Sequence, residues 1–207
     1  MQNTTNVELD NDKLKKKLRV LVDKFIAENG WSKSEEHIQT SFTIELLKLL
    51  GWDSANWIIN QGQDVQTGKK PDIILKSNTS KFLVIESKDA TKKDKLDGSY
   101  QTKTFIEQLF GYCETEGLYW GVLTNFVEWR LYAVNPKRLY KDKKYAFHDL
   151  LWENANKDSY VDLLSDDGLS FLNKISKQSL IAKNGKISSN PIYYPQQLDL
   201  EQEKIKK

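Results

Sequence analysis

The sequence predicts an α/β domain in which a mixed central β-sheet is flanked by helices. Two segments near the N-terminus carry apolar residues at helical spacing, and short runs rich in branched and aromatic residues follow them. A further helical segment divides these runs into two groups. With 207 residues, of which 39% are hydrophobic, the chain is long and apolar enough to form one substantial core.

The two N-terminal segments are expected to form amphipathic helices. The first covers residues 8–28 and is stopped by Asn29 and Gly30. The second begins after Ser34, a residue type that caps helix N-termini, and ends at Gly51. Each places its apolar residues on one stripe. The stripes consist of Leu14, Leu18, Leu21, Val22 and Phe25 in the first helix and Ile38, Phe42, Leu46 and Leu49 in the second.

The remaining elements alternate between strands and helices. A short strand is expected at 57–59, followed by strands at 72–76 and 82–88. A charged loop over 89–103 leads to a helix that carries Gln108. Strands at 119–124 and 128–134, joined through Asn125 and Phe126, come next, and helices near 145–153 and 160–182 end the series.

Charged side chains stand at the ends of two apolar runs. Asp72 opens one run, and Glu86 and Lys88 close the next, which is apolar on both faces as a central strand would be. Charge at the end of a buried strand is costly unless something compensates it. Because side chains alternate along a strand, we expect Glu86 and Lys88 on one face and Ser87 on the other. A hairpin through residues 77–80 would bring Asp72 near Glu86.

This combination of groups indicates a metal site. Two carboxylates and the backbone carbonyl of Ser87 are the oxygen ligands that suit Mg²⁺, with Mn²⁺ as the alternative. A divalent cation is the simplest compensation for the buried acids, and cleavage of a phosphodiester is the simplest reason to hold one.

The order of motifs resembles the PD-(D/E)xK nuclease superfamily. Pro71 and Asp72, followed by Glu86, Ser87 and Lys88, are similar to its signature. Three further stretches agree in order and spacing: residues 108–112 read QLFGY and match a Gln-x-x-x-Tyr motif, residues 46–53 form a leucine-rich helix that ends in Gly-Trp, and residues 120–125 and 129–132 resemble a closing strand pair. The resemblance covers residues 34–135. It is strongest to the N-terminal nuclease domains of type I restriction enzyme R subunits and of fused, type IIG-like restriction-modification enzymes.

The resemblance implies a restriction-endonuclease-like core and a role for each matching residue. Asp72 and Glu86 would hold the metal ion together with the Ser87 carbonyl. Lys88 would orient the attacking water and offset charge in the transition state. Gln108 would point from its helix toward the metal.

The residues around this core are weaker candidates. Tyr112 lies one helical turn after Gln108 and would contact the substrate backbone. Lys92 and Lys93 leave the proposed site directly and would contact phosphates. An acid on the preceding helix is common in these nucleases, and both Glu35 and Glu36 fit that role.

The function that the resemblance implies is a magnesium-dependent endonuclease domain that cleaves double-stranded DNA as part of a restriction-modification enzyme. A downstream methyltransferase, motor or specificity domain or subunit would be its partner. Two alternatives stay open: a DNA-repair or RNA nuclease of the same fold, and a non-catalytic member that binds DNA or acts as a scaffold. The intact Asp, Glu, Lys and Gln set argues against the non-catalytic alternative, and the leucine-Gly-Trp helix favours restriction.

Composition sets the outer limits of the domain and its location. Residues 1–183 are expected to form the nuclease domain, residues 184–198 a linker rich in Gly, Ser, Asn and Pro, and residues 199–207 the start of a helix truncated from a longer protein. The single cysteine, Cys113, excludes a disulfide framework and a cysteine-rich zinc site. No signal peptide or membrane span is apparent, so we expect a cytoplasmic protein with no membrane partner.

Overall fold

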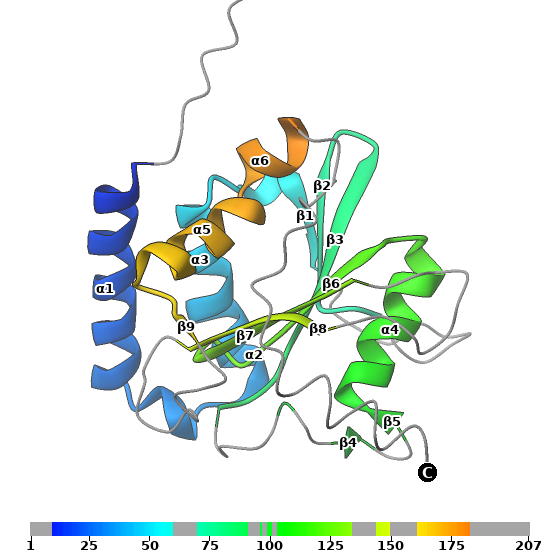
Figure 1. The fold of residues 1–207 in the computed structure, drawn as a ribbon. Coiled ribbons are helices and arrows are strands. Elements are labelled where there is room, and N and C mark those ends of the chain that lie inside the picture. Colours follow the sequence, from blue (N-terminus) through cyan, green and yellow to red (C-terminus); the bar gives the residue numbers. More distant parts are fainter. Residues whose placement is uncertain are drawn as a thin grey trace, which may run out of the picture.

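The computed structural model describes residues 10–59, 70–90, 96, 99–100, 103–133, 144–149 and 161–182. A seven-stranded mixed sheet lies at the centre, with helices on both faces, as the sequence predicts (Figure 1). Its strand order is β1-β2-β3-β6-β7-β8-β9, and all neighbours are antiparallel except the parallel pairs β3–β6 and β8–β9. The strands are β1 (Trp57–Ile59), β2 (Ile73–Ser77), β3 (Ser80–Ser87), β6 (Trp120–Thr124), β7 (Glu128–Ala133), β8 (Lys144–Asp149) and β9 (Val161–Asp162). A separate small sheet pairs β4 (Ser99–Tyr100) with β5 (Lys103–Thr104).

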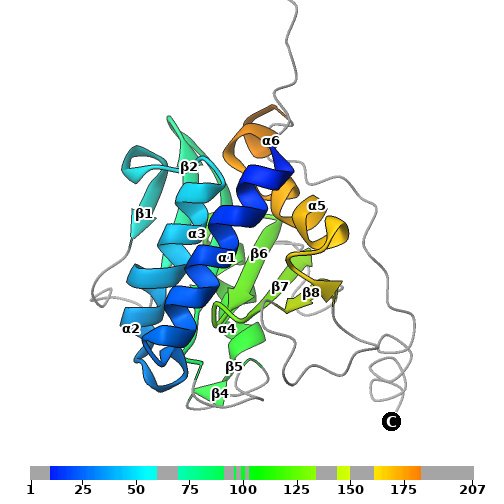
Figure 2. The ribbon, with the colours of Figure 1, turned by 90° about the vertical axis from the view of Figure 1, so that its left-hand side faces the viewer.

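One face of the sheet is covered by helices from both ends of the described chain. Helix α1 (Asn11–Ala27) is capped by Asp10, whose carboxylate accepts a 3.0 Å hydrogen bond from Lys13 N. Figure 2 shows α1 and α3 (Ile44–Leu49) in front of the strands, with α5 (Asp166–Lys174) and α6 (Lys177–Ala182) beside them. Their apolar stripes form one core with the inward residues of the sheet, and the expected stripe residues of the first two helices belong to it, Leu49 being only partly buried.

The second predicted helix is a composite of three pieces. Helix α2 (Glu35–Ile38) continues into a π-helical turn, η2 (Gln39–Thr43), and then into α3. Ser34 caps α2 as expected, because its hydroxyl accepts a 3.3 Å hydrogen bond from His37 N. The helix stops where Gly51 adopts a left-handed φ of 87°, a conformation that glycine tolerates best.

The opposite face of the sheet is covered by α4 (Phe105–Glu116). A capping box starts this helix: Thr104 Oγ1 accepts from Glu107 N at 3.1 Å, and Glu107 Oε2 accepts from Thr104 N at 2.7 Å. The helix lies so close to β6 that a Cβ added to Gly121 would come within 2.9 Å of Cys113 Sγ and of Leu109. Leu109, Phe110 and Cys113 form a second core cluster there.

One predicted element is wrong. The segment expected as a helix near 145–153 is a strand over its described part, β8, which pairs antiparallel with β7. Pairing with an otherwise open sheet edge stabilises an extended backbone, and local periodicity does not report such a long-range contact. The segment expected as a helix at 160–182 is divided into β9, α5 and α6.

The expected linker at 184–198 and the helix start at 199–207 lie outside the described residues. In the ranges that the structure describes, no helix combines the length and apolarity needed to cross a bilayer.

Candidate active site

The strand register brings Asp72 and Glu86 together. Strands β2 and β3 pair Ile73 with Ile85, so Asp72, one residue before β2, lies opposite Glu86. Ile74 and Val84, which share faces with Asp72 and Glu86, pack in the core cluster beneath α4. The predicted hairpin therefore places both acids on the α4 side of the sheet.

A hydrogen bond fixes the position of Asp72. Its Oδ2 accepts from the backbone N–H of Ser87 at 2.7 Å. On the other side, Gln39 Nε2 donates to the Asp72 carbonyl at 3.3 Å. Sequence reasoning missed Gln39, although it lies four residues after Glu35 on the same helical segment, a spacing that places two side chains on one face.

Lys88 lies at the centre of the cluster. Its backbone N–H donates to Thr124 O at 2.7 Å and extends the parallel pairing of β3 with β6. Its Nζ is 2.7 Å from Glu86 Oε1, 3.5 Å from Glu35 Oε1 and 5.1 Å from the centroid of the Phe105 ring. Groups from α2, β3 and α4 thus surround the ammonium of Lys88, a residue that is only 6% exposed.

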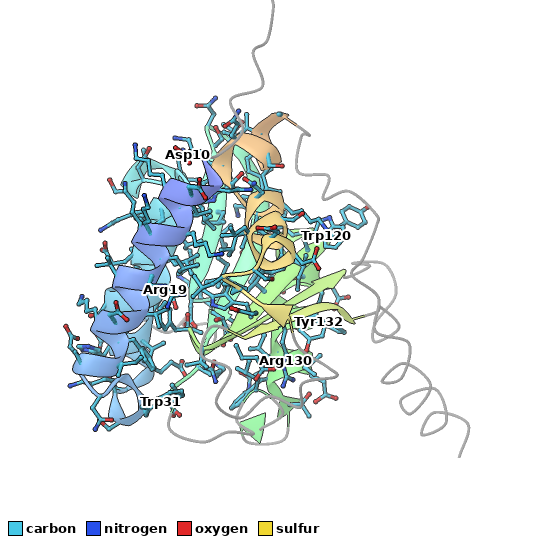
Figure 3. All side chains as sticks on the ribbon, turned by 60° about the vertical axis from the view of Figure 1, so that its left-hand side comes forward. Asp10, Arg19, Trp31, Trp120, Arg130 and Tyr132 are labelled. Carbon is cyan, nitrogen blue, oxygen red and sulfur yellow. The ribbon has the colours of Figure 1, made fainter. Side chains whose placement is uncertain are left out.

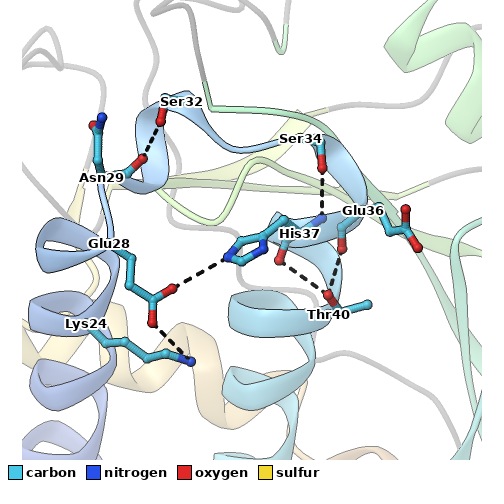
Figure 4. A network of polar contacts seen from close by, with 8 residues as sticks. All are labelled: Lys24, Glu28, Asn29, Ser32, Ser34, Glu36, His37 and Thr40. Atoms are coloured by element: carbon cyan, nitrogen blue, oxygen red, sulfur yellow. Dashed lines mark hydrogen bonds and ion pairs between the residues drawn. The ribbon is translucent and has the colours of Figure 1, made fainter.

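Of the two acids at the start of α2, only Glu35 belongs to this cluster. Glu36 is exposed. Figure 4 shows what holds the start of α2: Ser34 caps it, and His37 Nε2 lies 3.5 Å from Glu28 Oε2 at the end of α1. The rotation of α2 directs Glu35 toward Lys88 and leaves Glu36 exposed.

Electrostatics in the cluster are dominated by burial and by crowding of like charges. Burial raises the pKa of Glu86 to about 8, and the neighbouring Asp72 carboxylate adds to the rise, against the opposing effect of Lys88. Burial also raises the pKa of Asp72 and of Glu35. Burial alone would lower the pKa of Lys88, but Glu86, Glu35 and Asp72 together raise it. Lys88 is therefore a firmly charged ammonium at neutral pH.

The acids of the cluster carry more charge than Lys88 can balance. When all are ionised, Asp72, Glu86 and Glu35 leave two negative charges after Lys88 is counted. One oxygen of Glu86, Oε2, is buried and has no hydrogen-bond partner among the described residues. An unpartnered buried carboxylate oxygen is costly, and a hard cation would satisfy it. Within the described ranges, no group of three or more His, Cys, Asp or Glu side chains is arranged to hold a metal ion.

Helix α4 contributes Gln108 and Tyr112 to the same side of the sheet. Gln108 is 8% exposed, and its Nε2 is a buried donor with no partner in the described part of the chain. Burial raises the pKa of Tyr112, and the carboxylates of Glu86, Asp72 and Glu35 raise it further, so the phenol lies near the cluster and stays protonated. Phe105 precedes Gln108 by three residues. Residues three apart lie on the same face of a helix, so the spacing between Phe105 and Gln108 could have indicated Phe105, which sequence reasoning missed.

A second buried ion pair shares this face of the sheet but stands apart from the cluster. Arg130 Nε donates to Glu128 Oε1, and both residues lie on β7. Figure 3 labels Arg130 among the side chains of the domain. The register runs from Glu86 through Leu123 to Arg130, a separation of two strand spacings, or about 9–10 Å. The other two predicted phosphate-contacting residues, Lys92 and Lys93, lie outside the described residues.

Comparison of the chain with models of protein families, with curated proteins and with solved structures gave no match. The candidate site therefore stands on its own residues and their geometry.

Proposed function

We propose that this chain is a metal-dependent nuclease domain of the PD-(D/E)xK type, which cleaves phosphodiester bonds of DNA. The observation that carries the proposal is the buried Lys88 ammonium, which lies 2.7 Å from Glu86 and 3.5 Å from Glu35, with Asp72 held opposite Glu86 by its bond to Ser87 N. This is the donor set that phosphodiester hydrolysis with Mg²⁺ needs: hard oxygen ligands beside a fixed positive charge.

The order of elements supports a restriction-endonuclease-like core. Helical segments α2 to α3 precede an antiparallel β2–β3 hairpin, α4 connects β3 to its parallel neighbour β6, and β7 follows antiparallel. Glu35 from α2, Glu86 from β3 and Phe105 from α4 lie around Lys88, next to the ends of β3 and β6. Active sites of α/β sheets commonly lie at such strand ends.

The protein groups have distinct tasks in this proposal. Asp72, Glu86 and the Ser87 carbonyl would hold Mg²⁺ or Mn²⁺, with Glu35 as a further acid. The bound ion would polarise the scissile phosphate and lower the pKa of a water. Lys88 keeps its proton at neutral pH, so it would stabilise negative charge on the phosphate and orient the water rather than remove a proton.

Helix α4 would supply neutral hydrogen-bond donors. The Gln108 amide has a donor without a partner among the described residues, and the Tyr112 hydroxyl retains its proton at all ordinary pH values. Both can donate to phosphate oxygens without adding charge. By its resemblance to restriction enzymes, we place the domain in a restriction-modification system, with double-stranded DNA as substrate and a methyltransferase, motor or specificity partner.

The first test is Mg²⁺ and Mn²⁺ binding by calorimetry, with wild type compared with Asp72→Ala, followed by cleavage assays. Supercoiled duplex, linear duplex, single-stranded DNA and RNA are offered with either metal, and with EDTA as the blank. We expect metal binding that is lost in Asp72→Ala, and metal-dependent cleavage of duplex DNA that Lys88→Met abolishes. Preferential cleavage of RNA would favour the alternative nuclease. A folded protein that binds metal and DNA but cleaves neither strand would identify a non-catalytic member.

A further inference from the structure

Phe105 presents its ring to the Lys88 ammonium. The Nζ atom lies 5.1 Å from the ring centroid, within the range in which a cation is attracted to the negative face of an aromatic ring. Both groups are at least partly withdrawn from water: Lys88 is buried, and Phe105 is half-buried. The attraction is stronger in such a desolvated setting than on an open surface.

The helix that carries Phe105 is anchored along its length. Phe105 is the first residue of α4, where helices often fray, but the Thr104–Glu107 capping box closes this end. At the other end of the helix, Lys81 on β3 forms an ion pair with Glu116. The close approach of α4 to Gly121 fixes the middle. The position of the Phe105 backbone relative to β3 is therefore set by the packing of the whole helix.

The other two partners of Lys88 are carboxylates, the groups that would also bind a metal ion. Glu86 and Glu35 hold the ammonium at 2.7 and 3.5 Å. A cation bound by these carboxylates, for example at the unpartnered Glu86 Oε2, offsets their negative charge and repels the ammonium. It therefore weakens their hold on Lys88, whose four-carbon chain is flexible. An aromatic ring neither binds Mg²⁺ as a ligand nor changes charge, so its attraction for the ammonium persists when the acids are engaged.

We propose that Phe105 is a positioning residue that keeps the Lys88 ammonium at the site independently of the metal. The catalytic consequence rests on the proposed nuclease function, whereas the contact between ring and ammonium does not. Phe105 itself touches neither phosphate nor metal in this proposal.

The test compares Phe105→Leu with Phe105→Tyr, which keeps the ring. Phe110→Leu is the matched control, because Phe110 lies on the same helix but packs on Tyr132. The first readout is the NMR signal of the Lys88 ε-methylene, assigned by its loss in Lys88→Met. Ring currents should displace this signal in wild type, with and without Mg²⁺. The displacement should vanish in Phe105→Leu and remain in Phe105→Tyr and Phe110→Leu.

The second readout is cleavage kinetics. Phe105→Leu should lower kcat by about tenfold with KM for DNA nearly unchanged, and Phe105→Tyr should restore it. If Phe105→Leu fails to fold, singly and triply fluorinated phenylalanine at position 105 replaces it, because fluorination weakens the ring quadrupole with little change in size. Cleavage should then fall with each added fluorine.

The two proposals fail in different ways. An undisplaced Lys88 signal in wild type, or an unchanged kcat in a folded Phe105→Leu protein that has lost the displacement, would overturn the positioning role. Absence of cleavage in wild type, with the ring-dependent displacement intact, would overturn the nuclease function and leave the metal-independent contact standing.

Discussion

Asp72 Oδ2 accepts a 2.7 Å hydrogen bond from the backbone N–H of Ser87, so the acid that precedes β2 is fastened to the last residue of β3. The same register sets Asp72 opposite Glu86. Two carboxylates are thereby held side by side in a buried place, where they repel each other unless a cation or a proton intervenes. Lys88 offsets part of this repulsion, because its ammonium lies 2.7 Å from Glu86.

Replacing Asp72 separates its structural role from its metal-binding role. Asp72→Ala leaves the Ser87 N–H without its acceptor and should cost about 1–3 kcal/mol of folding stability. Asp72→Asn keeps an acceptor oxygen and removes the repulsion with Glu86, so it should be at least as stable as wild type. Both should lose Mg²⁺ affinity by tenfold or more in calorimetry, with urea denaturation as the stability measurement. Equal metal affinity in all three proteins would remove Asp72 from the ligand set.

Glu86 should make the stability of the metal-free protein depend on pH. Its pKa is about 8 in the folded chain, above the ordinary value of 4.5, so the folded state binds more protons between these values. Its stabilising contribution is complete below about pH 4.5 and is lost as pH rises through 8. Glu86→Gln has no such proton to lose and should exceed wild type by roughly 2–5 kcal/mol at pH 9.

The measurement for Glu86 is urea denaturation in EDTA at several pH values from 5 to 9. Glu36→Gln, a change at an exposed acid, serves as the control and should follow the wild-type profile. Parallel profiles for wild type and Glu86→Gln would show that Glu86 titrates alike in the folded and unfolded chains.

The adjacent acids at the start of α2 provide a matched pair for activity. Glu35 Oε1 lies 3.5 Å from Lys88 Nζ, whereas Glu36 is exposed. Glu35→Gln should lower the cleavage rate by about ten- to a hundredfold, since it removes one charge that shapes the site. Glu36→Gln should retain the wild-type rate. A larger loss in Glu36→Gln than in Glu35→Gln would reverse the assignment of the helix acid.

Two glycines, Gly121 on β6 and Gly111 on α4, test how α4 packs against the sheet. A Cβ on Gly121 would meet Cys113 Sγ and Leu109 at 2.9 Å, so Gly121→Ala should cost about 1–3 kcal/mol and displace α4. Gly111 lies on the same helix with nothing within 4 Å of an added Cβ, so Gly111→Ala should stabilise by about 0.5–1 kcal/mol. Thermal unfolding measures both. A stable Gly121→Ala protein would mean that α4 lies farther from the sheet.

The sequence by itself determined the local arrangement of the fold and much of the candidate site. Strand alternation places Glu86 and Lys88 on one face, and the short hairpin turn sets Asp72 opposite Glu86. The cap at Ser34 and the stop at Gly51 were readable for the same reason. These features depend on residues close together in the chain, where backbone periodicity and capping chemistry leave few choices.

Only the tertiary structure decided between Glu35 and Glu36, brought Gln39 and Phe105 to the site, and made β8 a strand. Each of these outcomes depends on how separate elements dock. A rotation of α2 by one residue would exchange its two acids, and β8 is extended because the edge of β7 offers hydrogen bonds to it. Docking is governed by packing and pairing between residues far apart in sequence, and a single pattern along the chain does not record those contacts.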